Sequence, residues 1–195
     1  MSDLQVFKRI FDIISSVLLL MAAMPFILII ALLLLITEGR PVFFIQKRIG
    51  KDGRHFDLFK FRTMIVDAID KGDGIFIKDK DTRITGPGYI LRRYSLDELP
   101  QLFNVIKGDM SVVGPRPPLT YYPYRYEDYP DKYSERFRVK PGLTGLAQIN
   151  GRNNIQWEER FVYDIEYINN NSFHFDIIIL LKSVYKVLNK EGIFV

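Results

Sequence analysis

The sequence predicts an α+β protein: a mostly helical globular domain with a short β-hairpin, preceded by an N-terminal helix that associates with a membrane. Three observations carry the prediction, namely an uncharged apolar run over residues 13–36, strand-like arms around residues 52–53, and helical spacing of apolar residues over residues 156–168. A chain of 195 residues suits one domain with a sizeable core plus such an appendage. We therefore divide the chain into a membrane-associated part, residues 1–39, and a globular domain, residues 40–195.

The charge balance and the cysteine content restrict the classes of function. A net charge of +4 and an isoelectric point near 9.2 favour anionic partners, such as nucleic acid, acidic lipid or phosphorylated substrates, without choosing among them. The chain has no cysteine and two histidines, His55 and His174. The sequence therefore excludes a disulfide framework, a thiol nucleophile and a zinc cluster.

The apolar run over residues 13–36 is long enough to cross a bilayer, because at about 1.5 Å per residue it reaches about 36 Å. Pro25 lies near its middle, removes one backbone hydrogen bond and leaves two arms that are each too short to span the hydrocarbon. Basic residues flank the run on both sides, with Lys8 and Arg9 before it and Arg40 after it, and they draw both flanks toward the cytoplasm. Two interpretations stay open: a re-entrant helix-break-helix hairpin and a proline-kinked transmembrane helix.

Residues 41–64 predict the β-hairpin. Two runs rich in aromatic and branched residues lie on either side of Asp52 and Gly53, a dipeptide typical of tight hairpin turns. The second arm carries Lys60 and Arg62 on one face. These cations either meet phosphate groups or point into solvent, and the pattern alone does not distinguish the two.

Four later segments complete the predicted domain. Residues 67–88 are rich in Asp, Gly and Lys and predict a loop, either an active-site cover or a surface excursion. Residues 140–154 predict a glycine-containing loop that matches neither a Walker A loop nor GxGxxG, so it gives no basis for nucleotide binding. Residues 156–168 predict a helix, and residues 173–190 predict an amphipathic helix that either packs on the core or lies in the membrane interface.

Two adjacent carboxylates, Asp97 and Glu98, come just before an apolar helical run, and they could simply cap that helix. Ser95 followed by Glu98 has the spacing of a capping box. With Ser95 as the cap, however, the first helical carbonyl would need the amide of residue 100, and Pro100 has none. We therefore expect Asp97 to cap the helix that runs to residue 107, with Glu98 in its first turn, Pro100 as its third residue and the helix dipole lowering the pKa of Asp97.

An ionised carboxylate at this place can also do chemistry. It can attack phosphorus and form an acyl phosphate, while its neighbour holds Mg²⁺, which prefers hard oxygen ligands and bridges them to pyrophosphate. Basic residues from three segments would neutralise the phosphoryl oxygens; these are Lys60, Arg92 and Arg116. Because adjacent acids are also common at helix starts, the pair alone does not decide between a cap and a catalytic site.

Five segments together resemble the bacterial sugar transferase family, whose members are monotopic polyprenol-phosphate phosphoglycosyl transferases. In chain order they read "KRIFDIISS", "FKFRTM", "RRYSLDELPQLFNVIKGDMSVVGPRP", "KPGLTGLAQINGRN" and "FVYDIEYI". The resemblance covers nearly the whole chain, and the long central segment is specific to the family. It is a resemblance to the small form of the family, in which no extra transmembrane bundle precedes the catalytic part.

The resemblance implies transfer of a phosphosugar from a UDP-sugar to undecaprenyl phosphate with release of UMP, the first membrane step in making surface glycans. Asp97 matches the nucleophile that forms a covalent phosphosugar intermediate, and Glu98 matches its partner acid in a Mg²⁺-dependent site. Five further residues match motif positions associated with phosphate or substrate contacts: Lys60, Arg92, Arg116, Arg152 and Asp164.

The resemblance also implies a membrane arrangement. The family has a re-entrant helix broken near its centre, here at Pro25, with both ends on the cytoplasmic face and amphipathic helices at the interface. We therefore expect the protein at the bacterial inner membrane, with a catalytic domain, residues 40–195, on the cytoplasmic side. The expected partners are the UDP-sugar, undecaprenyl phosphate and phospholipid, with no nucleic acid. Self-association as a homodimer and association with downstream glycosyltransferases stay open.

Two other classes of function are alternatives to the transferase. In a non-catalytic membrane-associated scaffold of a glycan assembly complex, the acidic pair would survive only as a cap. A nucleic-acid binder is favoured by the net charge alone, since the sequence has no recognisable nucleic-acid motif and this reading leaves the apolar run unexplained.

Overall fold

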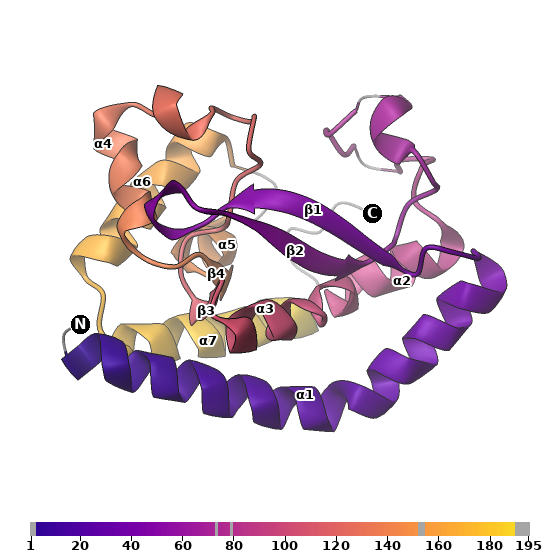
Figure 1. Ribbon diagram of the computed structural model, residues 1–195, viewed down its shortest axis with the longest axis horizontal. Helices are drawn as coiled ribbons and strands as arrows, with labels where there is room; N and C mark the ends of the chain where they lie inside the picture. The colour runs from indigo at the N-terminus through magenta and orange to yellow at the C-terminus, as the bar shows by residue number, and fades with distance from the viewer. Residues whose placement is uncertain (1–2, 73, 79, 152–154, 190–195) are drawn as a thin grey trace.

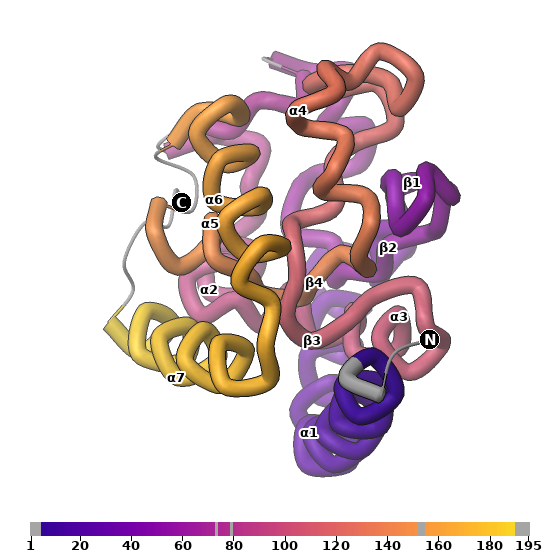
Figure 2. The backbone as a smooth tube through the Cα atoms, turned by 90° about the vertical axis from the view of Figure 1, so that its left-hand side faces the viewer, coloured from indigo at the N-terminus to yellow at the C-terminus, as the bar shows by residue number. Residues whose placement is uncertain are grey.

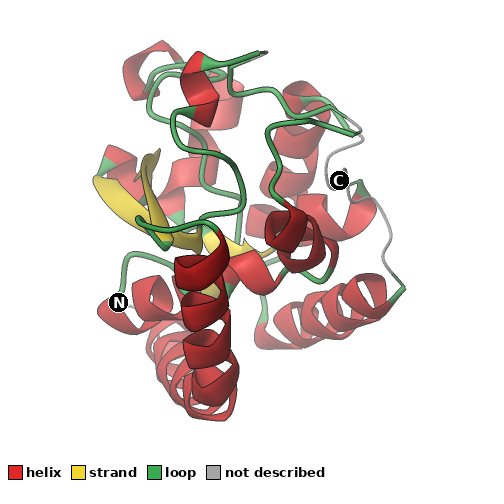
Figure 3. Ribbon diagram, turned by 90° about the vertical axis from the view of Figure 1, so that its right-hand side faces the viewer, coloured by secondary structure: helices red, strands yellow, loops and turns green. Residues whose placement is uncertain are grey.

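The computed structural model describes residues 3–72, 74–78, 80–151 and 155–189, and it confirms the predicted α+β class. Figure 3 shows helices on all sides of two small pieces of sheet. The α-helices are α1 (Asp3–Thr37), α2 (Gly86–Arg93), α3 (Gln101–Lys107), α4 (Asp131–Ser134), α5 (Leu146–Asn150), α6 (Trp157–Asn169) and α7 (Phe173–Leu188). The strands are β1 (Phe43–Ile49), β2 (His55–Phe61), β3 (Ser111–Val113) and β4 (Gly142–Thr144).

Helix α1 is continuous through Pro25 and bends as it passes beneath the domain (Figure 1). The predicted break is therefore a bend within one helix, for which the missing amide of proline gives a physical cause. The segment Gln5–Thr37 contains an 18-residue window with a mean hydropathy of 3.1, and it is long and apolar enough to cross a membrane by length and composition. The division of the chain at residue 39 stays a prediction.

One face of α1 packs against the globular domain. Its buried residues Leu20, Ile27 and Leu34 form a single cluster with Phe61 of β2 and Leu102 of α3. The opposite face exposes a band of large apolar side chains, which includes Leu18, Phe26, Leu28, Ile29 and Leu32. A helix with one buried face and one exposed apolar face suits the boundary between a protein domain and lipid.

The predicted hairpin is confirmed, with β1 and β2 antiparallel and Phe43 opposite Phe61. The turn lies at Lys51–Gly53, where Asp52 (φ 54°) and Gly53 (φ 77°) both adopt the left-handed conformation that matches the twist of a tight hairpin. Figure 1 shows β2 lying above α3.

The second sheet is a parallel pair of three-residue strands, β3 and β4, in which Ser111 is opposite Gly142 and Val113 is opposite Thr144. It lies in the middle of the fold, between the hairpin and the layer formed by α3 and α7 (Figure 1). The largest core cluster gathers around it, from Val105 of α3 to Tyr167 of α6 and Ile179 of α7.

The predicted helices near the C-terminus are confirmed as α6 and α7. Helix α7 starts with a side-chain cap, in which the Phe175 amide donates to Ser172 Oγ at 3.3 Å. One face of α7 packs on the core through Ile179, whereas Leu181 and Leu188 are exposed. Figure 2 shows α7 beside α1 at the lower side of the molecule, so both helices offer apolar residues near one face.

Candidate active site

The acidic pair lies on a short 3₁₀-helix, η3 (Leu96–Glu98), and not at the start of α3 as expected. The cause is Pro100, because the Leu96 carbonyl, deprived of a partner four residues later, accepts from the Leu99 amide at 3.2 Å. Ser95 adopts φ 55° and its side chain makes no capping hydrogen bond. The capping box is thus absent at Ser95, as predicted, while the expected helix start at Asp97 is wrong.

Lys60 of β2 stands beside both carboxylates. Its Nζ donates to Glu98 Oε1 at 2.6 Å and lies 4.0 Å from Asp97 Oδ2. All three side chains are largely shielded, with exposed fractions of 16% for Lys60, 12% for Asp97 and 21% for Glu98. The pair therefore shares one cation in a site of restricted solvent access.

The pKa of Asp97 is raised, because burial disfavours its charged form. Lys60 lowers it and the neighbouring Glu98 raises it again, so the balance stays above the ordinary value. The expectation of a lowered pKa is therefore wrong. Its premise, a full α-helix behind Asp97, does not hold in this structure.

Arg116 faces the pair from the loop that follows β3, with its Nη2 3.5 Å from Glu98 Oε1. The backbone of this loop is fixed from behind, since Arg136 Nη2 donates to the Arg116 carbonyl at 2.7 Å. Arg136 is itself buried, forms an ion pair with Asp164 at 2.8 Å and lies 4.9 Å from the centroid of the Phe161 ring. A rigid support thus holds Arg116 in place.

Arg92 comes from the last turn of α2, where its Nε donates to Thr63 Oγ1 at 2.8 Å. Burial lowers the pKa of Arg92, and the nearby Asp97 opposes this effect. Gly88 allows the close approach of α2, because a Cβ at this position would lie 2.1 Å from the Thr63 carbonyl oxygen. Helix α2 therefore brings Arg92 to the acidic pair by packing directly on the end of the hairpin.

These residues line one cavity of about 780 Å³. The predicted site residues Lys60, Arg92, Asp97, Glu98 and Arg116 all belong to its lining. The apolar part of the lining includes Leu19 and Ala23 of α1, as well as Phe43 and Phe61 of the hairpin. The cavity thus has charged groups suited to phosphates on its lining and an apolar wall to which α1 contributes.

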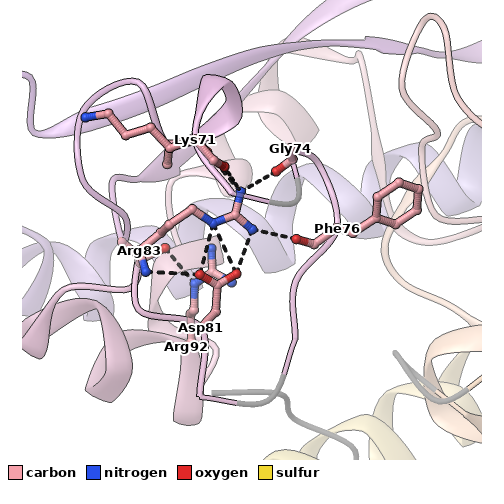
Figure 4. Close-up of polar contacts among 8 residues, drawn as sticks. Lys71, Gly74, Phe76, Asp81, Arg83 and Arg92 are labelled. Carbon is pink, nitrogen blue, oxygen red and sulfur yellow. Dashed lines mark hydrogen bonds and ion pairs between the residues drawn. The ribbon is translucent and has the colours of Figure 1, made fainter.

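The segment between β2 and α2, predicted as a loop, forms another wall of the cavity. Figure 4 shows that the Arg83 guanidinium organises this segment from within. It donates to the carbonyls of Lys71 at 2.9 Å, Gly74 at 2.5 Å and Phe76 at 2.5 Å, and it pairs with Asp81. The sequence left open whether this segment is an active-site cover or a surface excursion. Its place in the lining of the cavity supports the first interpretation.

One of the residues matched by the resemblance, Asp164, is not brought to the acidic pair. Asp164 of α6 is 1% exposed, pairs with Arg136 and is absent from the described residues that line the cavity. Burial raises the pKa of Asp164 to about 6. Arg152 lies outside the described residues.

Three basic residues were missed by the sequence reasoning. Arg48 of β1 and Arg160 of α6 line the cavity, and Arg136 supports the loop of Arg116. No local signal distinguishes them, since an arginine in a strand or in the first turn of a helix looks like any solvent-exposed charge. Their role becomes visible only where the fold places them together.

The donor set of the acidic pair fits Mg²⁺. This ion is commonly held by one or two carboxylates together with substrate phosphates, and Asp97 and Glu98 offer two adjacent carboxylates beside cationic groups suited to phosphate. Among the described residues, no group of three or more His, Cys, Asp or Glu side chains is arranged to hold a metal by itself. A metal here would therefore depend on oxygen ligands from the substrate.

Comparison with known proteins gives one family and several relatives. The pattern of the bacterial sugar transferase family matches residues 4–190. The chain is 46% identical over 189 residues to the sugar transferase EpsL of Bacillus subtilis, covering 96% of this chain and 90% of that protein.

Relatives with more specific names are longer than this chain. It is 43% identical to the UDP-glucose:undecaprenyl-phosphate glucose-1-phosphate transferase of Klebsiella pneumoniae, with 96% of this chain and 41% of that protein covered. It is 39% identical to the undecaprenyl-phosphate galactose phosphotransferase of Salmonella typhimurium, with 95% and 41% covered. The chain thus spans about two-fifths of the length of these two proteins.

Proposed function

The chain belongs to the bacterial sugar transferase family, and from this premise we propose that it transfers a sugar 1-phosphate from a UDP-sugar to undecaprenyl phosphate. Membership confirms the predicted family and the predicted transferase class. The names of the relatives from Klebsiella and Salmonella support the choice of lipid acceptor. The cavity carries the proposal, because a soluble donor and a lipid acceptor must meet where an apolar helix borders a charged site.

The proposed reaction has two displacement steps at one phosphorus. A carboxylate oxygen of Asp97 attacks the phosphorus that bears the sugar, the bond from this phosphorus to the bridging oxygen breaks, and UMP leaves with that oxygen. A phosphate oxygen of undecaprenyl phosphate then attacks the same phosphorus and displaces the Asp97 carboxylate. The products are UMP and the lipid diphosphate sugar, and Asp97 is regenerated.

The surrounding residues have distinct roles in this proposal. Lys60 keeps the two adjacent carboxylates together by sharing its charge between them, at 2.6 Å from Glu98 and 4.0 Å from Asp97. Arg92 and Arg116 offer guanidinium groups that can bind phosphoryl oxygens in a bidentate manner. Asp97 and Glu98 would hold Mg²⁺, which when bound supplies Lewis-acid stabilisation of charge on the diphosphate.

We place the protein at the bacterial inner membrane with its domain on the cytoplasmic side. Both ends of α1 are tied to the same domain, which supports a re-entrant arrangement. Near the N-terminal end, Arg9 donates to the Val105 carbonyl at 2.6 Å, and Asp12 accepts from the Val112 amide at 3.0 Å. Near the other end, Arg62 donates to the Glu38 carbonyl at 2.7 Å.

An assay of UMP release tests the proposed function. The full chain, reconstituted in lipid nanodiscs with Mg²⁺ and undecaprenyl phosphate, is incubated separately with UDP-glucose, UDP-galactose and UDP-N-acetylglucosamine. We expect one of these donors to give sustained UMP release that requires the lipid acceptor. No release from any donor would contradict the proposal and would favour the non-catalytic scaffold.

A further inference from the structure

Three arginines belong to the lining of the cavity, and the proposed roles above use one of them. Arg48, Arg116 and Arg160 all line the cavity. Burial lowers the pKa of Arg48 to about 9 and the pKa of Arg160 to about 10, and Arg116 is the next cause in both cases. The lining of one cavity and the hydrogen bond from Arg48 to the Pro117 carbonyl, next to Arg116, are the geometric basis for treating the three as one cationic cluster.

The guanidinium of Arg160 has capacity for a ligand. Its Nε donates to the Ile155 carbonyl at 3.2 Å, and the group lies 5.0 Å from the centroid of the Trp157 ring. Its two terminal nitrogens have no hydrogen-bond partner among the described residues. Asp164 is the acid whose charge raises the pKa of Arg160, and its carboxylate is already paired with Arg136. Several donor groups of Arg160 are therefore available in a partly buried position.

Arg48 is oriented by the loop that also carries Arg116. Its Nη1 donates to the Pro117 carbonyl at 3.0 Å, and its Nη2 donates to Gln46 Oε1 at 2.6 Å. Its Nε is buried and has no hydrogen-bond partner in the part of the chain that the structure describes. Glu98 is the acid that acts on Arg48, and this carboxylate is already shared with Lys60. The carboxylates near these three arginines are already engaged, Glu98 by Lys60 and Asp164 by Arg136. The three positive charges therefore suit an anionic ligand with several oxygens.

The place of the cluster in the fold favours a water-soluble ligand over a lipid. Arg160 belongs to the first turn of α6, and this end of α6 lies on the far side of the molecule from α1 (Figures 1 and 2). The apolar lining of the same cavity comes from Leu19 and Ala23 of α1. A lipid phosphate would approach along α1, whereas a nucleotide would approach from the solvent side.

We propose that Arg160, together with Arg48 and Arg116, binds the diphosphate of the nucleotide-sugar donor. This inference rests on the proposed transferase function. The planar fork of each guanidinium matches phosphate oxygens, and the stack on Trp157 holds the Arg160 fork in one orientation. In this arrangement Asp97 and Lys60 meet the phosphorus that is transferred, while the arginine cluster holds the part that leaves as UMP.

The test compares donor binding and acceptor use in the full chain in nanodiscs. Arg160→Gln should weaken UDP binding, measured by titration calorimetry, by about tenfold or more, because it removes charge-assisted hydrogen bonds. Arg160→Lys keeps the charge but not the fork and should fall in between. The KM for undecaprenyl phosphate should change by less than about twofold in both variants, since the lipid phosphate lies elsewhere.

Arg138→Gln is the matched control, because Arg138 is exposed and pairs only with Glu135 among the described residues. It should leave UDP binding unchanged. Equal UDP affinity of Arg160→Gln and the wild type would overturn the inference, as would a raised KM for the lipid with unchanged UDP binding. A wild-type chain that binds no UDP would instead contradict the proposed function itself, so the two failures are distinguishable.

Discussion

Lys60 favours the ionised state of the adjacent carboxylates of Asp97 and Glu98. Adjacent buried carboxylates repel each other, and burial already raises the pKa of Asp97. The Lys60 ammonium offsets part of both effects by lying within salt-bridge distance of each acid. At the scale of single residues, the pKa of Asp97 thus depends on a cation from a distant strand.

Replacing Lys60 by methionine tests this dependence. Lys60→Met should raise the pKa of Asp97 further, so the ionised fraction at neutral pH falls and the rate of adduct formation drops about tenfold or more. The pH at which the rate is half-maximal should move upward, as measured by quenched-flow assays between pH 5 and pH 9. Lys47→Met, which removes an exposed ion pair on the same hairpin, is the control and should leave the profile unchanged.

Asp164 gives a pH-dependent stability of defined sign. Its pKa in the folded protein is about 6, above the ordinary value of 3.8, so the folded state binds the proton more tightly than the unfolded state. The resulting contribution to stability is fully present below pH 4 and is lost as the pH rises through 6. Relative to Asp164→Asn, the wild type should lose at most about 3 kcal/mol between pH 4 and pH 7.

Denaturant unfolding of both chains in one detergent, at several pH values, measures this difference. A stability gap between wild type and Asp164→Asn that stays constant across this range would show that the buried pair with Arg136 does not titrate as described. The same variant leaves Arg136 without its partner carboxylate, so we also expect weaker support for the loop of Arg116.

At the scale of elements, the segment between β2 and α2 shows how one residue can replace regular structure. Arg83 satisfies backbone carbonyls that neither a helix nor a sheet serves, among them those of Lys71, Gly74 and Phe76. The Phe76 ring then reaches the Tyr122 ring, with centroids 5.4 Å apart. The segment thereby contacts the part of the chain that follows β3.

Arg83→Met should loosen this segment without unfolding the domain. Several carbonyls would lose a charged donor, so limited proteolysis should cleave within residues 66–82 about tenfold or more faster than in the wild type. Arg54→Met, at an exposed position in the hairpin turn, is the control and should match the wild type. Unchanged cleavage of Arg83→Met would show that Arg83 does not organise the segment.

The sequence predicted elements whose signals are local. Asp52 and Gly53 predicted the hairpin turn, and the spacing of Trp157, Phe161 and Ile165 predicted α6. It did not predict β3 and β4, because strands of three residues are too short for a period-two alternation to be detected. It placed the helix start at Asp97, although the missing amide of Pro100 instead selects a 3₁₀ turn.

At the scale of the whole molecule, the site is assembled from segments far apart in the chain. Lys60, Arg92, Asp97, Glu98 and Arg116 were named from the sequence, and the fold brings them to one cavity. Arg48, Arg136 and Arg160 were not, because their contribution depends on tertiary proximity to Arg116, which no local pattern encodes. Local motifs thus named the acidic pair and three of its basic neighbours, and only the fold revealed the other three arginines.

The arrangement of α1 predicts a topology that can be measured directly, since the chain contains no cysteine. Single cysteines at Gln5 and at Lys47, both exposed, should react with a membrane-impermeant maleimide from the same side of sealed inverted vesicles. A cysteine at Leu28, on the exposed apolar face of α1, should be protected from both sides. Labelling of Gln5→Cys and Lys47→Cys from opposite sides would reject the re-entrant arrangement.

The central claim is that Asp97 carries the sugar phosphate during the reaction, and intact-protein mass spectrometry tests it most directly. The full chain in nanodiscs is mixed with Mg²⁺ and a UDP-sugar in the absence of undecaprenyl phosphate, quenched in acid and weighed. We predict a mass increase equal to one sugar phosphate that maps to Asp97, is absent in Asp97→Asn, and disappears when the lipid acceptor is added. An unmodified wild-type chain that nevertheless turns over, or an Asp97→Asn chain with near-normal turnover, would contradict the account.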